Sequence, residues 1–154
     1  MLITTHAITG FTIGSISGNP YLASPLCFAS HYIFDALPHF EVSTFRKPNE
    51  KGLLPKNFWE VFFVLIDIFV ALIFLFFFRH LWSPASLAGV VFSVLPDFLD
   101  NVFLWSSYLH KLPIFQELFA LHKEFHHTAR GKKIFLGILT QVIIICICFA
   151  ILFL

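Results

Sequence analysis

Apolar residues are grouped into long runs along the chain. Three of these runs are almost unbroken and cover about residues 58–78, 84–105 and 134–154. A bilayer core of about 30 Å requires about 20 apolar residues per helix, so each run is long enough to cross a membrane. The pattern therefore predicts three membrane-crossing helices.

The first 40 residues are also apolar but contain more small and polar side chains. Gly18, Asn19 and Pro20 form a turn signal in the middle of this region. We therefore expect two shorter helices here, over about 3–17 and 21–38.

Residues 113–127 carry apolar side chains at helical spacing, including Phe115, Leu118 and Phe119. This spacing predicts an amphipathic helix that lies in the membrane interface, and Pro113 suits its first turn. The whole chain, 1–154, is thus expected to form one all-α membrane domain. It would be a polytopic bundle of about five transmembrane helices with one interfacial helix.

The composition supports this fold class. Of the 154 residues, 58% are hydrophobic and only 12% are charged, with a mean hydropathy of +0.83. Soluble domains have roughly 45–50% apolar and 25% charged residues, so an ordinary cytosolic domain and a disordered tail are excluded. A net charge of +1 also excludes nucleic acid as a partner. Nothing in the sequence indicates an obligate protein partner.

The basic residues predict the orientation of the bundle. With five spans, nine of the ten Lys and Arg residues fall on one side: Arg46, Lys47, Lys51, Lys56, Lys111, Lys123, Arg130, Lys132 and Lys133. The positive-inside tendency makes that side cytoplasmic. We therefore expect a multi-pass protein of the cytoplasmic (inner) membrane, with its N-terminus inside and its C-terminus outside.

Ionisable residues within the apolar runs carry the functional information, because each costs about 2.5–3.5 kcal/mol to insert into a membrane. His31, Asp35 and His39 are spaced i, i+4 and i+8, which predicts one shared face near the inner end of the second helix. Asp97 and Asp100 are spaced i, i+3 near the inner end of the fourth helix.

Two further histidine groups lie at the same end. His122 and His126 are spaced i, i+4 on the interfacial helix, with His127 beside them. His6, at the start of the first helix, shares a face with Gly10, Gly14 and Gly18. A ridge of small residues lets a neighbouring helix approach closely, so we expect the face that carries His6 to be packed.

Imidazole and carboxylate groups in such mixed sets are the ligands of a hard or borderline divalent metal. Seven or eight candidate ligands are too many for one tetrahedral ion but suit two ions about 3.5–4 Å apart, bridged by Asp35, Asp97 or Asp100. A two-metal site activates a bound water and favours hydrolysis of a phosphoester or other ester. A site at headgroup depth favours a membrane lipid or another membrane-held substrate. Lys123 or Arg130 would assist in binding phosphate.

The segments THAITG, SHYIFDALPH and LPDFLD, with the downstream histidine pair, resemble the small bacterial inner-membrane proteins called membrane-bound metal-dependent hydrolases. This family has a proposed kinship with zinc-dependent phospholipase C. The resemblance implies a divalent metal cofactor, zinc in the first place, with manganese or iron as alternatives. It also implies the metal ligands: His6, His31, Asp35, Asp97, Asp100, His122 and His126. This chain departs from the family pattern at Asn101 and in its late segment HKEFHHTARG.

The remaining polar residues of the region receive secondary roles. His39, His127 and Glu124 would act outside the ligand shell, as proton shuttles or general base. His110 lies near the end of a span and is interpreted as an interfacial residue. Asp67, alone in the third predicted helix (about 58–78), is expected at a helix interface with no catalytic role.

Two other interpretations stay open. HKEFHH has the form HxxxHH, which is similar to one histidine box of membrane fatty-acid desaturases and hydroxylases, whose di-iron centre attacks a lipid chain. A divalent-metal transporter or another non-enzymatic metal-binding membrane protein would also contain buried His and Asp. Transporter sites, however, lie near the midplane in paired broken helices, and this chain shows no clear internal repeat.

Overall fold

The computed structural model describes residues 1–41, 58–102 and 105–154, and it is all-helical, with no β-strand in those ranges. The α-helices are α1 (Ile3–Ser17), α2 (Pro20–Asp35), α3 (Phe58–Phe77), α4 (Pro84–Asn101), α5 (Ser106–Leu109), α6 (Pro113–Phe125) and α7 (Ile134–Leu152). Two short 3-10 turns, Arg79–Leu81 and Gly131–Lys133, precede α4 and α7. The all-α class predicted from the sequence is confirmed. Four of the basic residues used to predict the orientation lie outside the described residues, namely Arg46, Lys47, Lys51 and Lys56.

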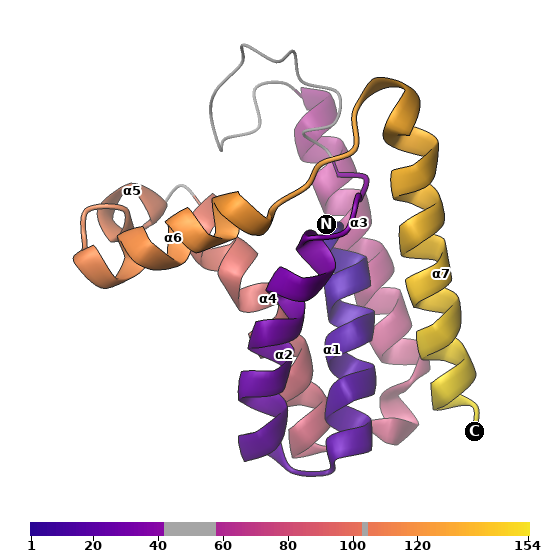
Figure 1. Cartoon of the computed structure of the whole chain (residues 1–154). Helices are drawn as coiled ribbons and strands as arrows, with labels where there is room; N and C mark the ends of the chain where they lie inside the picture. The colour runs from indigo at the N-terminus through magenta and orange to yellow at the C-terminus, as the bar shows by residue number, and fades with distance from the viewer. Residues whose placement is uncertain (42–57, 103–104) are drawn as a thin grey trace.

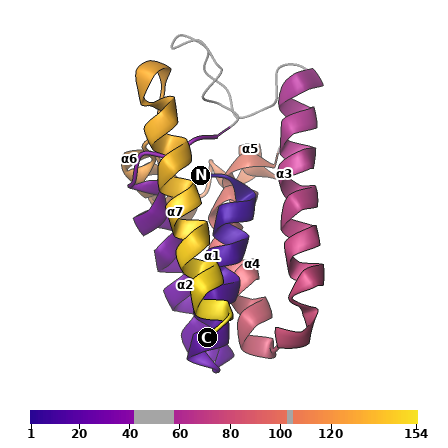
Figure 2. The same ribbon diagram turned by 90° about the vertical axis from the view of Figure 1, so that its right-hand side faces the viewer.

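The long helices α1, α2, α3, α4 and α7 stand side by side, and α5 and α6 project from one end of this bundle (Figure 1). α1 occupies the centre, where it packs against α2, α3, α4 and α7. The N-terminus lies at the end where α6 joins the bundle, and the C-terminus lies at the opposite end (Figures 1 and 2).

Small residues allow α1 and α4 to pack in close contact. A side chain at Gly10 would collide with Ser93 and with the Gly89 carbonyl, and one at Gly14 would collide with the Ala85 carbonyl. The predicted packed face of the first helix is therefore confirmed for these two glycines. Gly18 does not belong to it, because it ends α1 in a left-handed conformation, with a φ of 61° and open space around it.

The first turn of α1 is capped by side chains from other helices, because its own N-cap residue, Leu2, provides no side-chain acceptor. The carboxylate of Asp67 on α3 accepts hydrogen bonds from the backbone N–H groups of Ile3, at 2.7 Å, and Thr4, at 3.1 Å. Oε1 of Gln141 on α7 accepts from the Leu2 N–H at 3.2 Å. Asp67 thus lies at a helix interface, as expected, and it ties α3 to the start of α1.

α2 ends at Asp35, three residues before the predicted boundary at 38. Pro38 has no N–H to continue the helical ladder, and the residue before a proline disfavours the helical conformation. The fourth helix likewise ends at Asn101 rather than at about 105, and the interfacial helix ends at Phe125 rather than at about 127. The early end of α2 determines how His39 reaches the site described below.

Within the described residues, two helices are long and apolar enough to cross a membrane, Phe58–Phe77 and Gly131–Leu152. Only 22% of each candidate span is buried inside the protein. Their apolar outer faces therefore suggest contact with lipid.

Candidate metal centre

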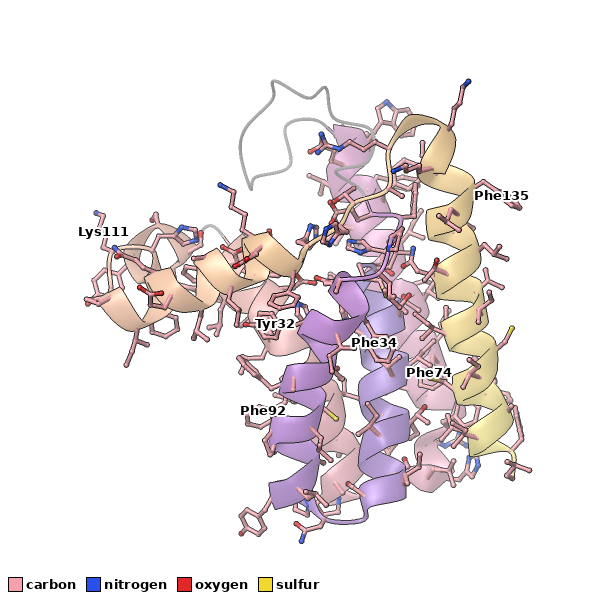
Figure 3. The ribbon with its side chains drawn as sticks, viewed as in Figure 1. Tyr32, Phe34, Phe74, Phe92, Lys111 and Phe135 are labelled. Atoms are coloured by element: carbon pink, nitrogen blue, oxygen red, sulfur yellow. The ribbon has the colours of Figure 1, made fainter. Side chains whose placement is uncertain are left out.

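The ends of several helices bring titratable side chains together at one end of the bundle. Asp35 ends α2, Asp97 and Asp100 lie in the last turns of α4, and His122 lies near the end of α6. Nitrogen-bearing and oxygen-bearing side chains gather where α2 meets α6, near Tyr32 (Figure 3). Residues from four sequence-distant segments, including the start of α1, therefore form one cluster.

Asp35 lies at the centre of this cluster, and its side chain is fully buried. Oδ1 accepts a 2.7 Å hydrogen bond from the amino group of Met1 and a 3.1 Å hydrogen bond from Nε2 of His6. Oδ2 faces Nε2 of His31 at 3.4 Å and Nε2 of His122 at 3.2 Å. One carboxylate oxygen is thus held in place, and the other faces imidazole nitrogens.

Three of the buried histidines are oriented through their Nδ1 atoms. His31 Nδ1 donates to the Ser93 carbonyl at 2.8 Å, and His39 Nδ1 donates to the Leu37 carbonyl at 2.9 Å. His122 Nδ1 lies 3.3 Å from Oδ2 of Asp100. Since a carbonyl or carboxylate oxygen can only accept, the Nδ1 atom of each ring carries the proton, and Nε2 of each neutral ring has a free lone pair.

The Nε2 atoms of His31 and His122 lie 3.3 Å apart. Two lone pairs at this distance repel each other unless a proton or a metal ion lies between the rings. Burial opposes the charged form of His122, but hydrogen bonds to Asp100 and Asp35 outweigh it and raise the pKa of His122 to about 10. Without a metal, a second proton on His122 therefore satisfies this pair of nitrogens.

Among the described residues, two groups of side chains have ligand atoms within 4.8 Å of one another. The first consists of His31, Asp35, Asp97 and His122, and the second consists of Asp35, His39 and His126. The buried cluster can therefore hold a metal ion, and Asp35 belongs to both groups.

His39 reaches the cluster from an extended segment and not from the predicted helical face. Its backbone N–H donates to the His127 carbonyl, at 3.2 Å, and its carbonyl accepts from the Ala129 N–H, at 2.8 Å. These bonds tie the segment after α2 to the segment after α6. The side chain is fully buried, burial lowers the pKa of His39 to about 4, and Nε2 has no hydrogen-bond partner among the described residues. A neutral, unpartnered imidazole in this position is suited to bind a metal.

Asp100 lies behind His122 and outside both candidate ligand groups, although the sequence placed it among the ligands. Its carboxylate contacts His122 Nδ1 through Oδ2 and accepts from His110 Nε2 through Oδ1, at 2.7 Å. His110, predicted to be a simple interfacial residue, therefore supports Asp100. The two residues form a chain of contacts that orients His122.

The other predicted site residues have mixed positions. His6 stacks on His31, with ring centroids 4.1 Å apart, and it contacts Asp35 without joining either ligand group. Glu124 and His127, predicted to shuttle protons, have exposed side chains. His127 Nδ1 donates to the Phe125 carbonyl, at 2.9 Å, so this ring is held by its own segment.

Sequence analysis did not identify two groups of the cluster, namely Glu41 and the amino group of Met1. Glu41 Oε2 lies 3.1 Å from Nε2 of His126, and Glu41 Oε1 accepts a 2.6 Å hydrogen bond from Thr128. Helical spacing could not reveal Glu41, because the helix ends before it. Its proximity in sequence to His39 was the only available indication.

Comparison with protein-family models, with curated proteins and with solved structures finds no match to this chain. The resemblance to membrane-bound metal-dependent hydrolases therefore rests on the residues described in the sequence analysis.

Proposed function

We propose that this protein is a membrane-embedded, metal-dependent hydrolase that cleaves a phosphoester or another ester of a membrane-held substrate at the cytoplasmic surface. The main observation in favour is the convergence of His31 and His122 Nε2, 3.3 Å apart, on the buried carboxylate of Asp35. Buried ionisable groups are costly in a membrane, so their presence there marks a candidate functional site.

The donor set fits a divalent metal of borderline hardness. Neutral imidazoles and ionised carboxylates are typical zinc ligands, and manganese or iron would accept the same set. The hydrogen bonds from His31 to the Ser93 carbonyl and from His122 to Asp100 are the outer contacts that orient metal-binding histidines in proteins.

Two ions would account for both candidate groups. His31, Asp97 and His122 would hold one ion, and His39 and His126 would hold the other. Asp35, which belongs to both groups, would contribute to both sites. The first group contains two carboxylates, which would balance much of the charge of its ion.

When bound, such a pair of ions lowers the pKa of a water toward 7 and stabilises the charge that develops on the ester oxygens. The protein has to position the substrate and move protons. Hydrolysis joins the water oxygen to phosphorus or to a carbonyl carbon, breaks the bond to the alcohol and transfers one proton to that alcohol. We assign Glu41 to accept and return this proton, since its side chain is 17% exposed and contacts His126.

We also propose that all five long helices cross the membrane and that the cluster lies at the cytoplasmic end. α1, α2 and α4 have 15, 16 and 18 residues, so they are about 22 to 27 Å long at 1.5 Å per residue. A bilayer core of about 30 Å accommodates such short helices by local thinning. The sideways position of α6 supports an interfacial helix at the depth of the cluster (Figure 1).

Metal content is the first test of this proposal. Elemental mass spectrometry of the detergent-purified protein should find about two equivalents of zinc or manganese, and an Asp35→Ala/Asp97→Ala double variant should lose them. Glu117→Gln, which removes an exposed carboxylate on α6, is the matched control and should keep the metal.

Hydrolysis is the second test. The metal-loaded protein in vesicles should release phosphate or a headgroup from an added phospholipid, and the double variant should not. Two equivalents of iron would favour the oxygenase interpretation instead. If the folded wild type contains no metal and binds none at neutral pH, the proposed mechanism is wrong.

A further inference from the structure

An apolar groove runs along α3 and α4, with α1 at its base. It has a volume of about 340 Å³, and all its lining side chains are apolar, among them Ile3, Ala7, Leu72, Val91 and Phe98. Figure 2 shows α3 on the far side of α1 from α2. The size of the groove is at the lower end of the range for ligand sites.

One end of the groove lies close in sequence to two residues of the candidate metal centre. Phe98, which lines the groove, directly follows Asp97, a member of the first ligand group. Ile3, which also lines it, follows closely on Met1, whose amino group contacts Asp35. A molecule that occupies both places must have a polar end and an apolar chain.

The length of the groove agrees with one hydrocarbon chain. On α4 the lining extends from Val90 to Phe98, which is about 12 Å at 1.5 Å per residue. Half of a bilayer core is about 15 Å thick. The groove therefore covers most of the depth of one leaflet.

We propose that this groove holds a hydrocarbon chain of the substrate, which is a lipid of the inner leaflet whose phosphoester reaches the metal centre. The proposal deepens the proposed function and rests on it. A soluble phosphoester would have no use for an apolar groove whose lining includes Phe98, the residue after Asp97.

The groove acts by positioning and not by affinity. Lipid tails are as apolar as the groove, so transfer of a chain from the bilayer into it releases little free energy. The chain instead fixes the depth and direction of the headgroup. Blocking the groove should therefore reduce turnover of a lipid while leaving metal content unchanged.

Leu72 and Ile73 on α3 provide a matched pair for this test. Their side chains are 57% and 52% exposed, but only Leu72 lines the groove. Leu72→Trp should fill the groove, and Ile73→Trp should add the same bulk outside it. Val91→Trp fills the groove from α4 if Leu72→Trp does not fold.

Photolabelling locates the chain independently of catalysis. The protein is reconstituted into phosphatidylcholine vesicles that contain phosphatidic acid with a diazirine on one chain, and the labelled residues are mapped by mass spectrometry. Labels should concentrate on the groove residues of α3 and α4 and should fall in Leu72→Trp but not in Ile73→Trp. Hydrolysis of phosphatidic acid should fall by about 10-fold to 100-fold in Leu72→Trp, in line with the cost of a misplacement of about 1 Å.

The outcomes separate this proposal from the proposed function. Labels spread evenly over the exposed faces of α3 and α7, or equal labelling in both Trp variants, would refute binding of the chain in the groove. This holds even if the protein hydrolyses a soluble ester such as bis(4-nitrophenyl) phosphate. Labels confined to the groove in a protein without metal or hydrolysis would support the lipid site and overturn the proposed function.

Discussion

Asp97 and Asp100 provide the sharpest test of the site, because they differ in role but have similar surroundings. Both lie in the last turns of α4, and the side chain of each is 14% exposed. Asp97 belongs to the first candidate ligand group, whereas Asp100 contacts His122 from behind. Substitution of each by Asn removes one charge and preserves shape, so a difference in metal affinity reports the difference in position.

The magnitude for Asp100→Asn follows from the contact between Asp100 and His122. A hydrogen bond to a charged group contributes about 1.5–3 kcal/mol, against about 0.5–1.5 kcal/mol for a neutral pair. Asn therefore weakens the orientation of His122 by about 1–1.5 kcal/mol, and 1.4 kcal/mol corresponds to about tenfold in affinity. Outer-shell substitutions in metal proteins cost about 10–100-fold, in agreement with this value.

Asp97→Asn should be more severe, because it removes a charged ligand from the ion itself. We expect a loss of more than about 100-fold, beyond the range of outer-shell effects. His110→Gln, which leaves the contact between Asp100 and His122 in place, should have the smallest effect of the three variants.

Competition with a chromophoric zinc chelator in detergent measures all three affinities, and circular dichroism checks that each variant is folded. If Asp100→Asn abolishes zinc binding as completely as Asp97→Asn does, Asp100 is a ligand, as the sequence suggested. If Asp100→Asn changes the affinity by less than about twofold, the assigned orientation of His122 is refuted.

Three further predictions concern protons and packing. Zinc binding at neutral pH should release a proton, because the pKa of His122 is about 10 and Nε2 must lose its proton to bind the metal. The affinity for zinc should therefore fall as the pH falls. Calorimetry in two buffers of different ionisation enthalpy measures the released proton. Gly89→Ala should lower the unfolding temperature, because its new side chain would collide with the Gly10 carbonyl, at a cost of about 1–3 kcal/mol, and an unchanged melting curve in detergent would contradict the close packing of α1 and α4. Asp67→Leu should destabilise the protein by about 2–4 kcal/mol, because the N–H groups of Ile3 and Thr4 lose their charged acceptor, and thermal unfolding should show this even in the metal-free protein.

Much of the fold follows from local patterns in the chain. The apolar runs expected at about 58–78, 84–105 and 134–154 coincide with α3, α4 and α7. The turn at Gly18 and Pro20 separates α1 from α2, as predicted. Gly18 adopts a left-handed φ that ends α1, and Pro20 suits the first turn of α2. The spacing of His31 and Asp35 on one helical turn likewise identified the centre of the cluster.

The roles within the cluster depend on contacts between distant segments. His39 is the clearest case, because the helix that was expected to carry it ends at Asp35, and pairing with the segment after α6 brings it back. Asp100 is another case. It contacts Nδ1 of His122 and not the Nε2 atom that faces the other ligands, and this contact depends on how α4 and α6 are placed. Glu41 has no helical register with any other site residue, so no spacing rule could include it.

Sequence periodicity could therefore indicate which residues share a helical face, because backbone geometry relates neighbours along one helix. The apolar runs and the positions of Lys and Arg indicated which residues lie at the same end of the bundle. Periodicity could not indicate which ring nitrogen faces which oxygen. The orientation of each imidazole is decided by hydrogen bonds to Ser93, Asp100 and Leu37, and two of these acceptors belong to α4. The contacts to Ser93 and Asp100 exist only after the helices have packed, and they help to distinguish a residue that can bind a metal from one that supports it.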